Sequence, residues 1–211
     1  MNDALKVKPY IAAISPYVAG KPIEETAKEY GLKLNEIVKL ASNENPLGMP
    51  ESARKAVEAV MTSVSRYPDG NARVFREAVA KHFGLTPDWV IGGNGSDEIL
   101  GLIARLVLTP ETSCVYSQYS FSVYELSAQE NGARCVCVPA KDFAVDLEAI
   151  AAAVDATTRL VFITNPNNPT GQLMGREYLQ ELLEHCRQQG ITVVVDECFI
   201  EFCESGREQP K

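Results

Sequence analysis

Apolar residues along the chain follow two alternating patterns. Short continuous apolar runs, typical of strands buried on both faces of a sheet, alternate with segments whose apolar residues recur every three or four positions, as on one face of a helix. The predicted strands are residues 89–93, 113–117, 134–138, 159–164 and 191–196. The predicted helices are residues 51–64, 73–83, 96–108, 121–132, 146–154 and 175–190.

Strands separated by helices predict parallel pairing through crossover connections. This is an α/β fold with three layers, α/β/α, in which helices cover both faces of a mainly parallel sheet. The first 45 residues carry turn signals, KPY, SPY, GKP and NENP, in place of this regularity. We therefore expect residues 1–45 to be an N-terminal arm and entry segment, and residues 46–211 to hold the α/β domain.

Charge and composition narrow the class of partner. The net charge of −8, with 28 acidic residues and no long basic run, disfavours nucleic acid and anionic membrane surfaces. The six cysteines form no C-x-x-C pair of the kind that binds zinc, so we expect no metal site and reduced thiols. The N-terminus lacks a signal-peptide pattern, and no apolar run approaches the length of a membrane span. A cytoplasmic protein that acts on small molecules or contacts another protein is expected.

Two candidate sites follow predicted strands, at the sheet edge where ligands of parallel sheets bind. In GGNGSDE, residues 92–98, a Gly-rich turn opens a helix whose free N–H groups would hold a phosphate, provided that Asp97 and Glu98 turn away from it. A plain turn is the alternative. Asp196 closes the apolar run ITVVVD, where a buried carboxylate needs strong donors or a cation. Helix capping and a protonated heteroaromatic nitrogen are the two interpretations of Asp196.

Two further candidates follow the strands at 159–164 and 113–117. In NPNNPTG, residues 165–171, each proline restricts the asparagine before it and removes an N–H group, so the loop keeps a fixed shape and leaves an asparagine amide free to donate. A rigid connection with no ligand is the alternative. Tyr119 lies in an aromatic run and either belongs to the core or stacks on a flat ligand.

The four candidates converge on one kind of ligand. Asn168 and Asp196 enclose one predicted helix and one predicted strand, so they are expected to end neighbouring parallel strands about 5 Å apart. A phosphate-binding turn, an aromatic face, an amide donor and a buried acid together predict a flat, phosphorylated ring that contains nitrogen.

These motifs resemble the histidinol-phosphate aminotransferases, which are fold-type I enzymes dependent on pyridoxal 5'-phosphate. The resemblance extends over nearly the whole chain, through stretches that begin with ISPYVAGKPIEE and include SNENPLG, GNGSDE and NPNNPTG in that order. The matching residues are 14–25, 39–48, 65–70, 93–100, 117–124, 165–171 and 193–197. The resemblance implies that residues 1–45 are an arm with a small-domain segment and that residues 46–211 form an incomplete cofactor-binding large domain.

The resemblance also implies a role for each cofactor-binding residue. Ser96 and Asp97 would supply the phosphate-binding turn, and Tyr119 would stack on the pyridine ring. Asn168 would donate to the phenolic oxygen of the cofactor, and Asp196 would keep its ring nitrogen protonated.

The implied reaction moves an amino group between histidinol phosphate and 2-oxoglutarate, a step of histidine biosynthesis. Tyr67 would reach the cofactor phosphate of a neighbouring subunit, which implies a homodimer. Tyr17, Asn43 and Asn94 are the implied substrate contacts.

The sequence departs from the family at two places. Phe199 stands where the family commonly has a tyrosine that also bonds the phenolic oxygen, and this feature resembles threonine-phosphate decarboxylases on the same fold. None of the ten lysines lies in the Ser-rich context of the family's catalytic lysine, and the terminal Lys211 is unmatched. No catalytic residue is therefore assigned, and the chain is expected to be the N-terminal portion of such an enzyme.

Two other interpretations remain at this point. The chain could be a non-catalytic remnant that binds the cofactor weakly or serves only as a partner. Rossmann-type nucleotide binding would require G-x-G-x-x-G, and GGNGSDE lacks the third glycine.

Overall fold

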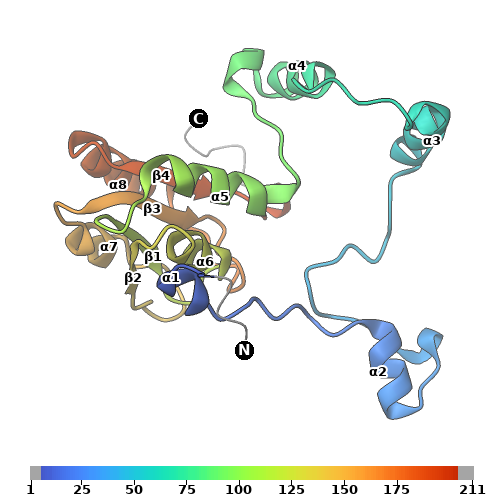
Figure 1. The fold of residues 1–211 in the computed structure, drawn as a ribbon, viewed down its shortest axis with the longest axis horizontal. Helices are drawn as coiled ribbons and strands as arrows, with labels where there is room; N and C mark the ends of the chain where they lie inside the picture. The colour runs from blue at the N-terminus through green and yellow to red at the C-terminus, as the bar shows by residue number, and fades with distance from the viewer. Residues whose placement is uncertain (1–5, 204–211) are drawn as a thin grey trace. The chain divides into compact units, whose positions relative to one another are not determined.

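Two units make up the protein in a computed structural model that describes residues 6–203. Unit 1 comprises Met1–Pro16 with Gly93–Lys211, and unit 2 comprises Tyr17–Gly92. Figure 1 colours both units by position along the chain, from blue at the N-terminus to red at the C-terminus. The predicted boundary at residue 45 falls within unit 2 and stays a prediction. Lys211 lies outside the described residues.

Unit 1 is built on a parallel sheet in the strand order β2-β1-β3-β4. Its strands are β1 (Ser113–Ser117), β2 (Arg134–Val138), β3 (Thr158–Thr164) and β4 (Thr192–Asp196). Each confirms a predicted apolar run to within one residue. The central strands β1 and β3 are almost wholly buried, whereas β2 and β4, each paired on one side among the described residues, are more exposed.

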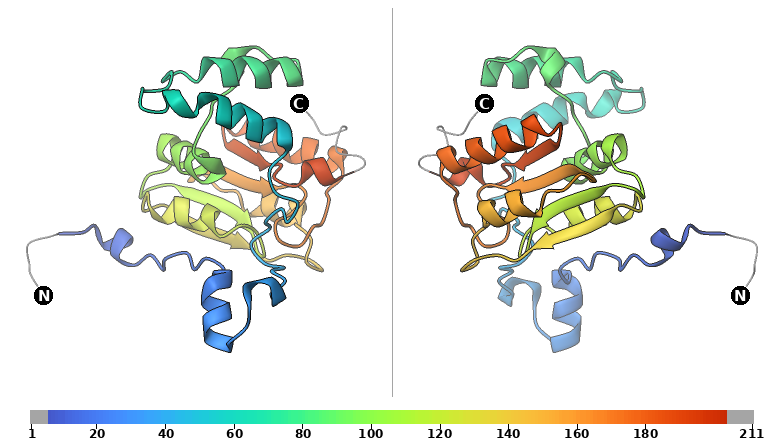
Figure 2. Two further views of the ribbon diagram at one scale, coloured as in Figure 1. Left: turned by 90° about the vertical axis from the view of Figure 1, so that its right-hand side faces the viewer. Right: turned by 90° about the vertical axis from the view of Figure 1, so that its left-hand side faces the viewer.

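Helices cover both faces of this sheet (Figure 2). Alternate strand residues point to opposite faces, so Tyr116 and Phe162 pack with one helix pair and Val115 and Val161 with the other. The first pair is α5 (Gly95–Val107) with α6 (Val123–Gln129), and the second is α7 (Leu147–Ala153) with α8 (Arg176–Gln188). The three-layer α/β/α prediction is confirmed. Unit 1 also contains α1 (Pro9–Ala12) and the 3-10 turn η4 (Ile200–Phe202).

Unit 2 is helical within the described residues. Its α-helices are α2 (Ile23–Tyr30), α3 (Glu51–Val60) and α4 (Arg73–Phe83), and its 3-10 turns are η1 (Leu34–Glu36), η2 (Met61–Ser63) and η3 (Pro87–Trp89). The predicted helix at 73–83 is confirmed, and the one at 51–64 becomes α3 followed by η2. None of the helices among residues 6–203 combines the length and apolar character needed to cross a bilayer.

The predicted strand at residues 89–93 is wrong. Val90 has extended backbone angles, but no described strand pairs with it. Its carbonyl oxygen instead accepts a hydrogen bond from Arg76 Nε at 2.8 Å. An apolar run predicts extended backbone, whereas a strand also needs a partner backbone, and residues 6–203 provide none for this segment.

The amino-terminal edge of the sheet is closed by a polar cluster around Asp155. Its carboxylate accepts hydrogen bonds from the Thr157 N–H group at 2.8 Å and the Thr157 hydroxyl at 2.7 Å, and it pairs with Arg134. The Thr157 hydrogen bonds, aided by Arg134, lower the pKa of Asp155 to about 2. This carboxylate links the loop before β3 to the start of β2.

We expect Asp155 to contribute to the loss of stability of the fold at acid pH. Because its folded pKa lies below the unfolded value of about 3.9, its contribution is fully present above about pH 4 and is lost as pH falls through about 2. Asp155→Asn should lower the melting temperature at pH 6 and have a smaller effect near pH 2, as measured by circular dichroism. Glu181→Gln on the outer face of α8 is the matched control. A melting-temperature difference that stays constant with pH would contradict the prediction.

Candidate functional site

The carboxyl ends of β3 and β4 lie side by side. Thr164 and Asp196, the last residues of the two strands, are partners in the parallel register. The N–H group of Asn165 donates to the Asp196 carbonyl at 2.9 Å and continues the pairing into the next loop. The predicted neighbourhood of the Asn-Pro loop and Asp196 is therefore confirmed.

The Asp196 carboxylate is held by neutral donors. The Tyr124 hydroxyl, from α6, donates to Oδ2 at 2.7 Å, and the Cys198 N–H group donates to Oδ1 at 3.1 Å. Tyr124 also shares a hydrogen bond of 2.6 Å with the Thr164 hydroxyl. Burial, followed by the nearby Asp196 charge, raises the pKa of Tyr124 above its usual value, so its hydroxyl stays protonated and able to donate.

Further negative charge surrounds Asp196. Burial, followed by the charges of Glu201 and Asp196, raises the pKa of Glu197. Burial and the Asp196 charge also raise the pKa of the Cys198 thiol to about 11, so this cysteine stays protonated at neutral pH. No lysine or arginine within residues 6–203 forms an ion pair with Asp196. This end of the sheet is therefore electronegative, with Glu197 and Glu201 close to Asp196.

The Asn-Pro loop is fixed by two of its own asparagines. Asn165 is fully buried; its Oδ1 accepts from the Met174 N–H group at 2.8 Å, and its Nδ2 donates to the Met174 carbonyl at 3.3 Å. Asn167 donates through Nδ2 to the Tyr119 carbonyl at 2.9 Å and to the Thr170 hydroxyl at 2.8 Å. The loop therefore holds the segment after β1 as well as itself.

Asn168 is the least buried of the three asparagines. Its side chain makes no hydrogen bond with another of residues 6–203, and it is only half-buried. Gly171 follows with a φ of 73°, which suits glycine and lets the chain turn toward α8. The loop thus has a backbone held by Asn165 and Asn167, and the contact of the Asn168 amide with a ligand stays a prediction.

Two aromatic side chains flank this edge from the segment after β1. Tyr119 has a φ of 55°, is 49% exposed and packs its ring against Phe143 with centroids 5.3 Å apart. Phe121 is half-buried and meets the Tyr124 ring edge-on at 5.8 Å. The sequence did not assign Phe121 to the site. Phe121 nevertheless contacts Tyr124, the residue that donates to Asp196.

The predicted phosphate turn is the amino end of α5. The Glu98 carboxylate turns back and accepts from the Asn94 N–H group at 2.6 Å. Ser96 and Asp97 are exposed and make no side-chain hydrogen bonds with other described residues. A helix of 13 residues spans about 20 Å, and residues 108–112 join its carboxyl end to the start of β1, so its amino end extends toward the carboxyl edge of the sheet.

The remaining predicted residues belong to unit 2. Tyr17 and Tyr67 are exposed, Tyr67 fully, and Asn43 has a φ of 50°. Their proposed contacts with substrate or cofactor stay predictions.

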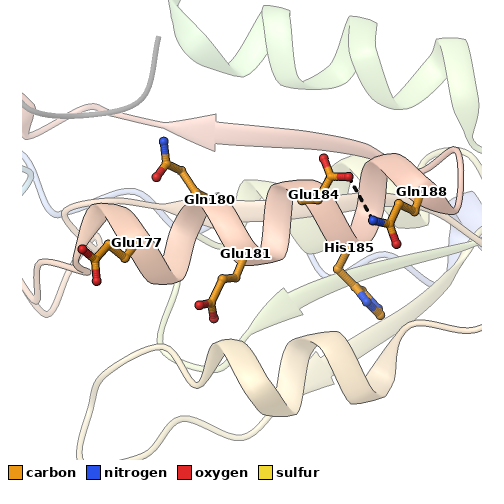
Figure 3. A pocket seen from close by; sticks show the side chains of 6 residues that line it. All are labelled: Glu177, Gln180, Glu181, Glu184, His185 and Gln188. Atoms are coloured by element: carbon orange, nitrogen blue, oxygen red, sulfur yellow. Dashed lines mark hydrogen bonds between the residues drawn. The ribbon is translucent and has the colours of Figure 1, made fainter.

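A shallow depression on α8 is a different kind of feature (Figure 3). Its lining comes from this one helix: Glu177, Gln180, Glu181, Glu184, His185 and Gln188. Hydrogen bonds from Arg187 and then Gln188 lower the pKa of Glu184 to about 2, so this carboxylate is already paired. No second element contributes a group to the depression, which therefore represents a solvated helix face.

The loop geometry predicts that Asn165 and Asn168 differ in structural importance. Asn165→Ala removes both side-chain bonds to the Met174 backbone and should lower the free energy of unfolding by about 1–3 kcal/mol. Asn168→Ala, the matched control in the same loop, should change it by less than about 0.5 kcal/mol. Urea unfolding of both variants checks this. Equal losses would show that the loop is not held in this way.

The chain matches the family described as aminotransferase class I and II over residues 35–210. It is 49% identical over 199 residues to histidinol-phosphate aminotransferase 1 of Cupriavidus pinatubonensis, a match covering 94% of this chain and 53% of that protein. It is also 49% identical over 192 residues to the histidinol-phosphate aminotransferase of Methylobacillus flagellatus, covering 91% of this chain and 52% of that protein. The chain spans about half the length of these curated relatives.

Solved structures agree in fold. The histidinol-phosphate aminotransferase of Sinorhizobium meliloti, crystallised in complex with pyridoxal-5'-phosphate, superposes with a TM-score of 0.86 at 27% identity, covering 99% of this chain and 55% of that one. The aspartate aminotransferase of Thermus thermophilus with maleate, at 22% identity, gives a TM-score of 0.78 and covers 92% and 53% of the two chains. This second likeness bears on the fold alone.

Proposed function

The chain belongs to the aminotransferase class I and II family, and from this we propose that it forms the cofactor-binding part of a pyridoxal-phosphate-dependent aminotransferase of the histidinol-phosphate type. The observation that carries the proposal is the electronegative position at Asp196. Its carboxylate is anchored by Tyr124 and the Cys198 N–H group and is paired with no cation among the described residues. A protonated ring nitrogen is the partner that such a carboxylate fits.

The chemistry of the cofactor explains why this position matters. Pyridoxal 5'-phosphate, when bound with its ring nitrogen protonated, supplies an electron sink for the pair of electrons left at the substrate Cα. Asp196 would accept the hydrogen bond from that nitrogen and keep the proton on it. Because Asp196 ends a strand and both its oxygens are held, its position is set by the sheet itself.

Other residues at this edge fit the remaining parts of the cofactor. The free amide of Asn168 suits the phenolic oxygen, because the loop around it is fixed by Asn165 and Asn167. Ser96 and Asp97 at the amino end of α5 are the proposed phosphate contacts. The Glu98 carboxylate turns back onto this end and accepts from the Asn94 N–H group, so it must move aside for a phosphate to bind there.

Two aromatic residues are candidates for the ring face. Tyr119 is the one that its sequence context favours. Phe121 lies against Tyr124 and is a second candidate on geometry.

We assign the amino donor from the names of the relatives, and the acceptor from the family resemblance of the sequence. Histidinol phosphate and 2-oxoglutarate are the proposed pair, and Tyr17, Asn43 and Asn94 the proposed substrate contacts. Phe199 cannot donate a hydrogen bond, so control of the phenolic oxygen would rest on Asn168. The ten lysines include none in the context of a Schiff-base lysine, so the proposed reaction needs a lysine that these 211 residues do not supply.

A homodimer in the cytoplasm completes the proposal. The helix α3 and the turn after it expose an apolar stripe, Val57, Val60, Met61 and Val64, of the kind that marks interfaces. Tyr67, a few residues further on, would contact the cofactor phosphate of the partner subunit. All six cysteines are free thiols, which suits a reducing compartment.

We expect the 211-residue chain to bind pyridoxal 5'-phosphate reversibly and without borohydride-stable labelling. Asp196→Asn removes the anionic acceptor and should weaken binding about tenfold or more, since a hydrogen bond to a charged group contributes about 1.5–3 kcal/mol. An absorbance titration measures both effects, with Glu181→Gln as the control. Unchanged affinity in Asp196→Asn would exclude the assigned orientation of the ring.

The substrate is tested separately with the chain completed by the C-terminal portion of a relative. Transamination of histidinol phosphate with 2-oxoglutarate is the expected result. Release of carbon dioxide from threonine phosphate without transamination would replace the assignment by a decarboxylase.

A further inference from the structure

The Tyr124 side chain joins the core of unit 1 to the Asp196 carboxylate. It comes from α6, is fully buried, and reaches across to the last residues of β3 and β4. We propose that Tyr124 is a positioning residue that fixes the orientation of Asp196 toward the ring nitrogen of the cofactor. The inference rests on the proposed function and assigns one further residue to that site.

The direction of the hydrogen bonds follows from the chemistry of the groups. An ionised carboxylate only accepts, so the single hydroxyl proton of Tyr124 is donated to Asp196 Oδ2. The bond between Tyr124 and Thr164 must then have the Thr164 hydroxyl as donor. The result is a directed chain, Thr164 to Tyr124 to Asp196, in which each bond polarises the next.

Packing fixes the position of the Tyr124 hydroxyl. The ring stacks on Phe162 with centroids 4.7 Å apart and an interplanar angle of 13°, and Phe121 meets it edge-on. The Tyr124 side chain has no exposed surface, so its oxygen has no room to follow a moving carboxylate. Asp196 must therefore take up the orientation that Tyr124 allows.

Two anchors define the plane of the carboxylate. Tyr124 holds Oδ2, and the Cys198 N–H group holds Oδ1. Both donors are neutral, so they orient the group without neutralising its charge. The remaining lone pairs are left for a cationic donor. If the Tyr124 hydroxyl only stabilised the core, its removal would not selectively weaken the binding of a ligand that carries a cationic donor.

The test compares two ligands that differ only at the ring nitrogen. Tyr124→Phe removes one oxygen and keeps the ring packing, and it should weaken binding of pyridoxal 5'-phosphate about tenfold. Binding of the analogue whose ring nitrogen is replaced by carbon should change less than twofold. Tyr116→Phe, another largely buried tyrosine on the same face of the sheet, is the matched control and should alter neither affinity.

A second variant guards against loss of folding. Thr164→Val removes the donor to Tyr124 and should produce a smaller loss of the same kind, restricted to the ligand with nitrogen. Circular dichroism of each variant establishes that it is folded before binding is measured. Equal loss for both ligands, or no loss for either, in the folded variants would overturn the role of Tyr124. Failure of the unmodified chain to bind either ligand would instead overturn the proposed function, and the role of Tyr124 with it.

Discussion

The pairing of β3 with β4 is the constraint on which the site depends. It sets Thr164 beside Asp196 and carries the Asn-Pro loop away from the same sheet edge. The apolar faces of these strands are buried against helices on both sides, so a shift in their register would expose core residues such as Phe162 and Ile163. The cost of that exposure keeps Asp196 and the start of the Asn-Pro loop in a fixed relation.

The same loop connects the site to β1. Asn167 holds the carbonyl of Tyr119, so the turn after β1 and the turn after β3 form one polar unit. Tyr124, on the helix α6 that follows this turn, donates to Asp196. β1, β3 and β4 thus contribute to one edge, through residues at or after their carboxyl ends, as expected for a ligand site of a parallel sheet.

The sequence predicted the sheet more fully than the site. Buried parallel strands require continuous apolar runs, and these runs matched β1 and β2 to the residue. Counting elements was enough to predict that the strands before the Asn-Pro loop and ending at Asp196 are neighbours. It was not enough to separate Asn165 and Asn167, which hold the loop, from Asn168, which is half-buried and bonds to none of the described residues, because all three have the same side chain. The strand predicted at 89–93 failed because pairing depends on residues far away in the chain.

Tyr124 was difficult to predict because its ring and its hydroxyl serve different purposes. The ring occupies an apolar position on α6 and packs in the core. The hydroxyl finds its acceptor 72 residues further along the chain, which only the folded sheet brings near. A tyrosine at a predicted core position indicates that its hydroxyl has a hydrogen-bond partner. Residue spacing along the sequence does not identify that partner.

Neutral donors hold the Asp196 carboxylate without cancelling its charge. An arginine or lysine at this position would satisfy the carboxylate in the unliganded protein, and a ligand cation would then have to displace it. A tyrosine hydroxyl and a backbone N–H group lower the cost of burying the charge while leaving it uncompensated. The protein thereby retains a negative charge of fixed orientation at the end of a strand, and under the proposed function a protonated ring nitrogen would supply the matching positive charge.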